Sequence, residues 1–263
     1  MFQFNFLDNT VTSNEHSNTS ESDSCNPHNA KEVFPNPSVF TQTVDNVRTL
    51  SYSDNLDIRL ISDVTFPSNS LLSTAESNHS DLLAGVYEGG LKIWECTHDL
   101  AKFIVNENLN LTNKNVLDLG CGGGIIGIIA CVRGAEVCFQ DYNEDVISYF
   151  TIPNVHLNSQ TKKSRFYSGD WESFSSIVCT QYDIIFTCET VYNPDNYSKL
   201  CKVFAQCLKP NGFIYLAAKG HYFGCGGGLN DFVEFLKHKT EFRSETCWKY
   251  SNGLERAILK IYF

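Results

Sequence analysis

After residue 80 the hydrophobic positions alternate between two periods, so the chain is predicted to form strands and helices in turn. Leu91–Val105 has apolar residues at helical spacing, and Asn115–Leu119 is a short apolar run that ends at a glycine cluster, as a buried strand does. The pattern also predicts helices over Ile125–Arg133, Val146–Asn158 (started or interrupted by Pro153), Tyr197–Leu208 and Leu229–Lys239, strands over Glu136–Gln140, Tyr182–Thr187 and Phe213–Ala218, and a break at Lys209–Gly212.

The C-terminal residues depart from this alternation. Phe242–Tyr250 and Glu255–Tyr262 are predicted to be two strands joined by a turn containing Asn252-Gly253, which is a strong hairpin signal. The near-continuous apolar strand Tyr182–Thr187 is typical of a sheet covered on both faces. The predicted fold class is therefore α/β, with a doubly wound, seven-stranded, mostly parallel sheet, helices on both faces and a C-terminal antiparallel hairpin.

Residues 1–79 are predicted to be an acidic, Ser/Asn-rich and largely disordered segment, and residues 80–263 to be one folded domain. Residues 1–80 hold three basic and ten acidic side chains, which account for −7 of the chain's net charge of −10. Such a composition buries too little apolar area to offset the entropy lost on ordering. Short apolar clusters at Val33-Phe34 and Leu56–Phe66 are expected to add a strand or a docking segment.

Charge, hydropathy and cysteine usage exclude several classes of protein. The sequence has no basic stripe, so we expect no direct nucleic-acid binding, whereas a basic protein partner is compatible with the acidity. It has no run of 18 apolar residues and no signal-peptide pattern, so we expect neither a membrane helix nor secretion. The eleven cysteines include no C-x-x-C pair, which favours free thiols in a reducing compartment and no metal site.

The strongest local motif is the glycine-rich turn that follows the strand Val116–Leu119. Glycines there allow positive φ and a close approach of the backbone to a ligand, and the next helix offers free N–H groups. Gly122-x-Gly124-x-x-Gly127 matches a dinucleotide fingerprint, but that pattern alone is weak. Asp118 just before the turn would repel a pyrophosphate and suits the ammonium of a methionine moiety, although an aspartate can also simply cap a turn.

Two further acidic residues follow later strands. Asp141 comes about 20 residues after the glycine turn, where an acid accepts hydrogen bonds from ribose hydroxyls in either cofactor class. In Gly169-Asp170-Trp171 the carboxylate can accept from an adenine amino group and the indole can stack on the ring, although this tripeptide alone is ordinary loop chemistry. Together with Asp118, the series favours S-adenosylmethionine as the cofactor.

Several blocks in order make the chain similar to a known family. They are Gly85–Thr97 (GVYEGGLKIWECT), Val116–Gly122, Phe139–Asn143 (FQDYN), Pro153–Val155, Gly169–Trp171, Glu189–Asn193 (ETVYN) and Ala218–Gly228 with its YFG-x-GGG run. The chain resembles the protein-histidine N-methyltransferases that modify a large-subunit ribosomal protein, within the seven-stranded set of protein methyltransferases. The resemblance covers roughly residues 80–263.

The resemblance implies S-adenosylmethionine as donor, a histidine ring nitrogen as acceptor and a ribosomal protein as partner. We also expect the enzyme to act as a monomer. The resemblance also implies cofactor contacts, which together with the residue-based candidates are Ile93, Trp94, Glu95, Cys96, Thr97, Asp118, Gly120, Gly122, Gln140, Asp141, Tyr142, Asn143, Gly169, Asp170, Trp171 and Cys188. The three scattered basic residues before residue 81 give no basic import signal, so the cytoplasm is the expected location, with the nucleus second.

The acceptor chemistry points to catalytic candidates. An imidazole with pKa about 6.5 is mostly neutral at pH 7, whereas neutralising a lysine amine would cost roughly 4.6 kcal/mol. A hydrogen-bond acceptor on one ring nitrogen would fix the tautomer, so we predict that Glu189 or Asn193 orients the ring and that Tyr192 packs beside it. The alternative is that Glu189 only supports the cofactor or the fold. Gly224–Gly228 is predicted to form a flexible loop over the acceptor.

Three other functions stay open at the level of sequence. The first is a lysine methyltransferase of the same fold, and the second is a cofactor-binding interaction protein without catalysis. The third is an NAD-dependent oxidoreductase, which would use the glycine turn for a pyrophosphate.

Overall fold

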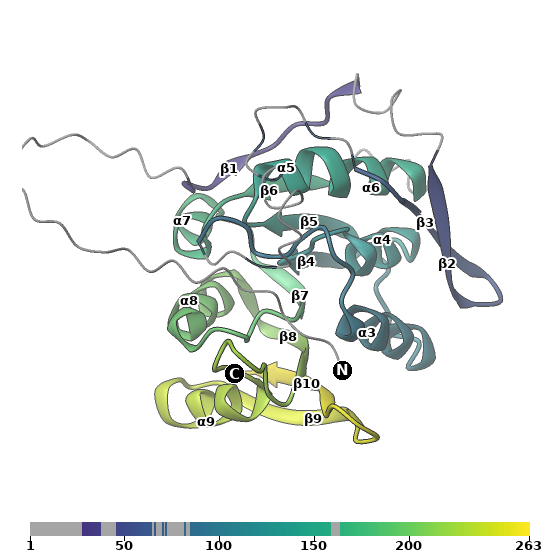
Figure 1. Cartoon of the computed structure of the whole chain (residues 1–263). Coiled ribbons are helices and arrows are strands. Elements are labelled where there is room, and N and C mark those ends of the chain that lie inside the picture. Colours follow the sequence, from purple (N-terminus) through teal and green to yellow (C-terminus); the bar gives the residue numbers. More distant parts are fainter. Residues whose placement is uncertain are drawn as a thin grey trace, which may run out of the picture.

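The computed structural model describes residues 28–37, 46–64, 66, 70, 72, 82, 85–158 and 164–263. Its main sheet has eight strands in the order β1-β6-β5-β4-β7-β8-β10-β9, and a separate hairpin pairs β2 with β3 (Figure 1). The strands are β1 (Lys31–Glu32), β2 (Val47–Ser53), β3 (Leu56–Ile61), β4 (Asn115–Leu119), β5 (Glu136–Asp141), β6 (Arg165–Ser168), β7 (Tyr182–Cys188), β8 (Leu208–Lys219), β9 (Arg243–Tyr250) and β10 (Arg256–Tyr262). The helices are α3 (Glu95–Asn106), α4 (Ile125–Val132), α5 (Glu144–Val146), η1 (Ile147–Thr151), α6 (Ile152–Asn158), α7 (Trp171–Ile177), η2 (Pro194–Asn196), α8 (Tyr197–Cys207) and α9 (Leu229–Lys239).

The predicted fold class is confirmed, but the predicted strand count of seven is wrong. The strands β6, β5, β4, β7 and β8 are parallel, and the hairpin β9–β10 adds antiparallel to β8, as predicted. The eighth strand, β1, pairs antiparallel with the edge strand β6. Strand β1 consists of two polar residues, which show no hydrophobic periodicity. They are extended because they pair with the otherwise open edge of β6, so the sequence pattern could not predict this strand.

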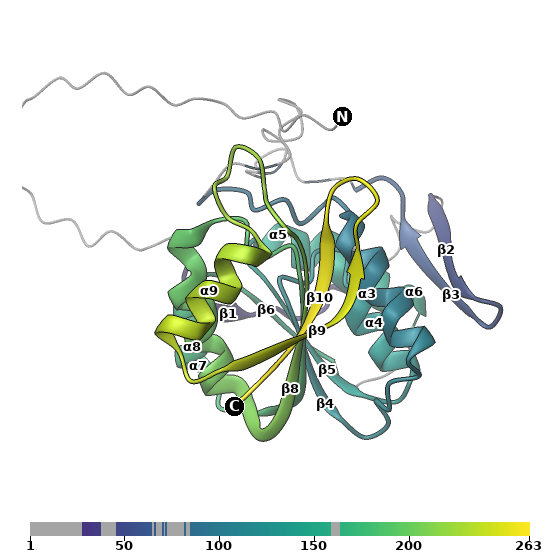
Figure 2. The same ribbon diagram turned by 90° about the horizontal axis from the view of Figure 1, so that it is seen from below.

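Helices cover both faces of the sheet. Figure 2 shows α3, α4 and α6 on one side and α7, α8 and α9 on the other. The strands contribute to both cores: in β7, Ile184 and Phe186 pack into the first cluster and Ile185 into the second. The sheet is thus buried on both faces, which explains why its central strands are almost uniformly apolar.

Two local predictions are refined by the structure. The predicted helix Val146–Asn158 begins at Glu144 and runs through the π-helical turn η1 before Pro153, the second residue of α6. Proline has no N–H to donate, and a widened turn tolerates that loss. The predicted break at residues 209–212 lies inside β8, where the pairing with β7 jumps from Leu208 to Phe213 and leaves those residues as a bulge.

Part of the N-terminal segment packs on the helical layer. In β3, which comes from the predicted apolar cluster Leu56–Phe66, Ile58 and Leu60 are fully buried in the core shared with α3 and α4. Residues 1–27, 38–45 and 73–81 are among those outside the described residues, so the predicted domain boundary after residue 79 and the disorder before it stay predictions. Within the described ranges, no helix is long and apolar enough to cross a membrane.

Candidate functional site

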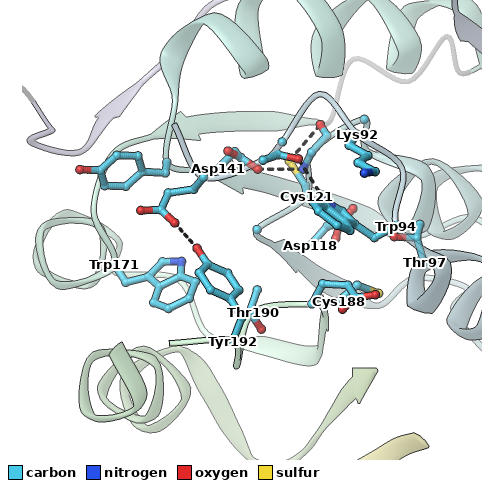
Figure 3. A pocket seen from close by; sticks show the side chains of 18 of the residues that line it. Lys92, Trp94, Thr97, Asp118, Cys121, Asp141, Trp171, Cys188, Thr190 and Tyr192 are labelled. Atoms are coloured by element: carbon cyan, nitrogen blue, oxygen red, sulfur yellow. Dashed lines mark hydrogen bonds between the residues drawn. The ribbon is translucent and has the colours of Figure 1, made fainter. Parts of the chain in front are cut away.

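A cavity of about 240 Å³ opens at the carboxyl ends of β4, β5 and β7, where the sequence predicted a cofactor (Figure 3). Its wall includes most of the predicted cofactor residues: Ile93, Trp94, Thr97, Asp118, Gly120, Gly122, Asp141, Tyr142, Asp170, Trp171 and Cys188. The predicted catalytic residues Glu189, Tyr192 and Asn193 line it too. The strands of a parallel sheet end together at this edge, so residues distant in sequence meet there.

The glycine turn after β4 is closely packed. Gly122 has φ +48°, and a Cβ there would lie 2.8 Å from the backbone oxygen of Gly90. Gly120 has φ +67°, and its Cβ would lie 2.8 Å from Cγ2 of Thr190. The turn therefore fits between the 85–90 loop and the end of β7 only because these positions lack side chains.

Asp118 combines the two roles that the sequence left open. Its Oδ2 accepts a 2.8 Å hydrogen bond from the N–H of Gly127 in the first turn of α4, which ties β4 to that helix. The same side chain lies on the cavity wall with only 3% of its surface exposed. Burial raises the pKa of Asp118 to about 8, with a smaller contribution from Asp141. A cation in the cavity would favour the ionised form.

Asp141 closes β5 and is held by the glycine turn. Its Oδ2 accepts a 2.8 Å hydrogen bond from the N–H of Gly122, and its Oδ1 lies 3.4 Å from the N–H of Asn143. Burial raises the pKa of Asp141 to about 6, and these backbone N–H groups oppose the rise. The carboxylate is thus fixed in position with lone pairs left for hydroxyl donors.

Asp170 has a structural role at the same end of the cavity. It is the N-cap of α7, accepting from the N–H of Glu172 at 2.9 Å through Oδ1. Its Oδ2 pairs with Nζ of Lys199 at 2.9 Å. An adenine amino group would have to share the Asp170 oxygens with the N–H of Glu172 and the ammonium of Lys199. The adenine contact therefore stays a prediction.

Trp171 stands beside Asp170 with its indole fixed by a buried amide. Nε1 of Trp171 donates to Oε1 of Gln140 at 3.1 Å, and Nε2 of Gln140 donates to the backbone oxygen of Gly169 at 2.8 Å. In Figure 3 the indole faces the cavity on the side of Asp141. The ring is therefore held in a defined orientation in which a planar base could stack on it.

Trp94 forms the opposite side of the cavity. Its Nε1 donates to the backbone oxygen of Gly89 at 3.1 Å, and Nζ of Lys92 lies 4.6 Å from its ring centroid. The buried Nζ of Lys219 lies 5.4 Å from the same ring and 2.9 Å from Oε2 of Glu95. These contacts fix the aromatic face at the start of α3.

Glu189 follows β7 in a left-handed conformation, with φ +59°. Its Oε1 accepts from the N–H of Cys96 at 3.2 Å and lies 4.0 Å from Nζ of Lys219. Its Oε2 accepts from the hydroxyl of Tyr222. Burial raises the pKa of Glu189, and Lys219 opposes that rise. The carboxylate thus binds α3 to the end of β8, a structural role that the sequence analysis kept as an alternative.

A second, smaller cavity of about 30 Å³ adjoins the first. Its walls are Leu82, Glu88, Trp94, Glu189, Tyr192, Tyr222 and Cys225, four of which also line the larger cavity. The hydroxyl of Tyr192 donates to Oε2 of Glu88. Cys225 comes from the predicted glycine loop, where Gly227 and Gly228 pack too closely on neighbouring backbone to admit a Cβ. The flexibility predicted for that loop stays a prediction.

Five predicted cofactor residues lie behind the wall of the cavity rather than on it. They are Glu95, Cys96, Gln140, Asn143 and Gly169. Four of them contact a residue that does line it: Gln140 and Gly169 orient Trp171, the N–H of Cys96 donates to Glu189, and the side chain of Asn143 accepts from the N–H of Glu88 at 3.2 Å. Glu95 instead pairs with Lys219. We infer that these positions matter through the residues they hold.

The residues at the site that were not predicted from the sequence include Glu88, Lys219 and Tyr222. All three lie in the quoted sequence blocks, Glu88 in the first and the other two in the last. Their positions in motifs were the available signal, because nothing in the spacing shows that residues 88, 189 and 222 face one cavity.

The fold and the site together define a class of protein. The sheet is mostly parallel, has a glycine turn after its central strand and an acid at the end of the next strand, and finishes in an antiparallel hairpin. This is the class I methyltransferase fold, whose members use S-adenosylmethionine. The cavity fits that cofactor, since buried Asp118 can meet an ammonium, Asp141 a ribose and Trp171 a base.

Comparison with known proteins gives the family. The family described as lysine methyltransferase matches residues 79–235, and the chain belongs to it. The chain is 41% identical over 229 residues to the histidine protein methyltransferase 1 homolog of Bos taurus, covering 75% of this chain and 61% of that protein. It is 38% identical over 262 residues to the Mus musculus homolog, covering 88% and 69%.

The chain thus spans less than two thirds of the bovine relative's length. Among solved structures, the ribosomal protein L11 methylase of Lactobacillus delbrueckii subsp. bulgaricus matches with a TM-score of 0.51 and 15% identity, covering 82% of this chain and all of that one, which supports the fold alone. Membership of a methyltransferase family decides against the dinucleotide-binding interpretation of the glycine turn.

Proposed function

We propose that this chain is a protein-histidine N-methyltransferase that transfers a methyl group from S-adenosylmethionine to a ring nitrogen of a histidine in a large-subunit ribosomal protein. The observation that carries the proposal is the pair of adjoining cavities, one of about 240 Å³ and one of about 30 Å³, which share Glu88, Trp94, Glu189 and Tyr192. Identities of 38–41% to proteins named histidine protein methyltransferase support the choice of acceptor.

The larger cavity would hold the donor. Asp118 would meet the ammonium group, Asp141 the ribose hydroxyls and Trp171 the base, since all three line this cavity (Figure 3). When bound, the donor supplies an electrophilic methyl group on a sulfonium. The protein's part is to hold the acceptor nitrogen in line with that methyl and to exclude water.

The smaller cavity would receive the acceptor. Its volume is only two to three times the minimum that one water needs, which restricts the acceptor to a slender or flat group. Two aromatic rings, Tyr192 and Tyr222, stand at 70° to each other with their centroids 6.2 Å apart on its wall. A mostly neutral imidazole could react there without a strong base.

The sequence resemblance and the charge of the chain support the proposed substrate. A ribosomal protein is rich in basic side chains and suits the acidic segment before residue 80, which holds most of the net negative charge. We propose that the enzyme works as a monomer in the cytoplasm, with the nucleus as a second location. A lysine methyltransferase is the second candidate, because the matching family carries that description.

Incubating the full chain with labelled S-adenosylmethionine and ribosomes that lack the modification tests the proposal. We expect label on one histidine of a large-subunit protein, located by mass spectrometry. The matched control is Asp141→Lys, which should lose the label because the charge at the ribose position is reversed. Label on lysine would select the second candidate. Binding of S-adenosylhomocysteine without label on any protein would instead indicate a non-catalytic interaction protein.

A further inference from the structure

Among the described residues, two carboxylates line the acceptor cavity, and each accepts two hydrogen bonds, but they differ in burial and in the charge beside them. Glu189 is engaged through both oxygens, by the N–H of Cys96 and the hydroxyl of Tyr222, and it faces the ammonium of Lys219. Only 7% of its surface is exposed. Glu189 therefore serves to connect α3, β7 and β8, and its burial beside the ammonium of Lys219 makes it less accessible to a substrate than Glu88.

Asn193, the other predicted orienting residue, is also occupied. Its Oδ1 accepts a 3.0 Å hydrogen bond from the N–H of Asp195, which makes it the N-cap of η2. It lines the larger cavity and is absent from the wall of the smaller one.

We propose that Glu88 is the carboxylate that binds the N–H of the target imidazole and thereby selects which ring nitrogen is methylated. This inference rests on the proposed histidine methyltransferase function. Glu88 lies in the loop before α3 and lines both cavities, at their junction with Trp94 and Tyr192. It is only partly buried, so its carboxylate can be reached by a group that enters from outside.

The surroundings of Glu88 hold its carboxylate in place. Its Oε1 accepts from the N–H of Gly85 at 2.7 Å, and its own N–H donates to the side chain of Asn143 at 3.2 Å. Its Oε2 accepts from the hydroxyl of Tyr192, whose pKa is raised well above its usual range, first by burial and then by Glu88 itself. Tyr192 therefore stays a donor. A carboxylate offers about four lone-pair sites, and these two bonds leave capacity for a further N–H.

The chemistry requires such a group. A neutral imidazole carries one N–H and one lone pair, and binding the N–H at Glu88 leaves the other nitrogen free to face the larger cavity. That nitrogen forms a bond to the methyl carbon while the carbon–sulfur bond breaks and its electron pair stays on sulfur. The ring is then an imidazolium cation, which the carboxylate stabilises. The proton on the other nitrogen leaves through Glu88 to solvent, so charge and atoms balance.

The test uses Glu88→Gln and Glu88→Ala, with Glu189→Gln as the rival variant and Glu234→Gln as the matched control. Glu234 is an exposed carboxylate on α9, with 59% of its side chain accessible. Each variant is incubated with S-adenosylmethionine and the ribosomal substrate, the protein is hydrolysed in acid, and the two methylhistidine isomers are separated by chromatography. The position of the methyl group is informative because a merely structural role would not change it.

We expect wild type and Glu234→Gln to give one isomer at equal rates. Glu88→Gln keeps an oxygen that accepts the N–H but loses the charge, so we expect the same isomer with kcat lowered about 100-fold, the range of a positioned acid–base group. Glu88→Ala loses both and should give a mixture of isomers. Binding of S-adenosylhomocysteine by calorimetry should stay within a few fold for both.

Two results would overturn the proposal. One is a single, unchanged isomer from Glu88→Ala at a rate within twofold of wild type. The other is a mixture of isomers from Glu189→Gln while both Glu88 variants keep the wild-type isomer and rate. If Glu88→Ala proved inactive or unfolded, the rate and product of Glu88→Gln would decide. A wild-type chain that labels no histidine would refute the proposed function itself, which is a distinguishable outcome.

Discussion

Cofactor binding should be coupled to the ionisation of Asp118. Burial raises the pKa of this carboxyl to about 8, so near pH 7 it is mostly protonated in the protein without cofactor. In the proposed site Asp118 accepts from the ammonium of the cofactor's amino-acid part, and this positive charge favours the ionised carboxylate. Binding must therefore release the proton of Asp118, and the affinity should depend on pH.

The size of the effect follows from the fraction of ionised Asp118. Below its pKa that fraction rises tenfold per pH unit, and the apparent affinity of a ligand scales with the fraction of binding-competent protein. We expect the affinity for S-adenosylhomocysteine to rise about tenfold from pH 6 to pH 7, which corresponds to about 1.4 kcal/mol. Binding near pH 7 should release nearly one proton for each ligand bound.

Isothermal titration calorimetry in two buffers of different ionisation enthalpy measures both quantities. Asp118→Asn is the matched variant, since it keeps an oxygen that can accept from the N–H of Gly127 but cannot titrate. It should bind more weakly at pH 7 and show no pH dependence from this site. Equal affinities at pH 6 and pH 7 in the wild type would refute the reasoning, and so would an equal slope in the Asn variant.

The same shift has a consequence for stability, with a definite sign. The pKa of Asp118 is higher in the folded protein, about 8, than in the unfolded chain, about 3.9, so the folded state binds the extra proton. Its contribution is full below about pH 4 and is lost as the pH rises through about 8. Without cofactor, Asp118→Asn should therefore be more stable than wild type at pH 8, measured by urea unfolding.

Three other predictions concern the cavity and its support. Gly226→Ala should cost only about 1 kcal/mol of stability, because its φ is +82° but no atom lies within 4 Å of a Cβ built there. Gly122→Ala should cost a further 1–3 kcal/mol, because its Cβ would lie 2.8 Å from a backbone oxygen, and equal losses in denaturant unfolding would contradict this. Trp171→Ala should weaken S-adenosylhomocysteine binding by about 1–3 kcal/mol, a typical loss for base stacking, and Trp171→Phe by less, as calorimetry would show. Removing residues 1–34 should lower the free energy of unfolding by about 2 kcal/mol, because this deletes a strand and a buried valine. Removing residues 1–27, which the sequence predicts to be disordered, should leave it unchanged, and matching melting curves for the two shortened chains would oppose this.

The sequence was informative where physical chemistry imposes a period. Strands buried on both faces must be apolar throughout, so Tyr182–Thr187 was predicted within one residue of β7 (Tyr182–Cys188). The helix Leu229–Lys239 was predicted with the bounds of α9 because its apolar stripe ends in a basic turn. Strand β1 has no such period, and its partner lies more than 130 residues away.

At the site, too, some residues could be predicted from the sequence and others could not. Asp118 and Asp141 could be placed because the ends of parallel strands meet at one edge of the sheet, and both line the cavity. The difference between Glu88 and Glu189 could not be predicted. It depends on how deeply each carboxylate is buried and on the ammonium of Lys219, which the fold brings to Glu189 from 30 residues away.

The short strand β1 has a consequence for how this protein can be divided. The matching family begins at residue 79, but the residues that cover the free edge of β6 are Lys31 and Glu32, the latter also held to Arg165 by a double ion pair. A chain trimmed to the family's limits would present a row of unpaired backbone groups, to which a strand of another molecule could add. Self-association of such a fragment would then reflect the trimming, and the oligomeric state should be studied on the longer chain.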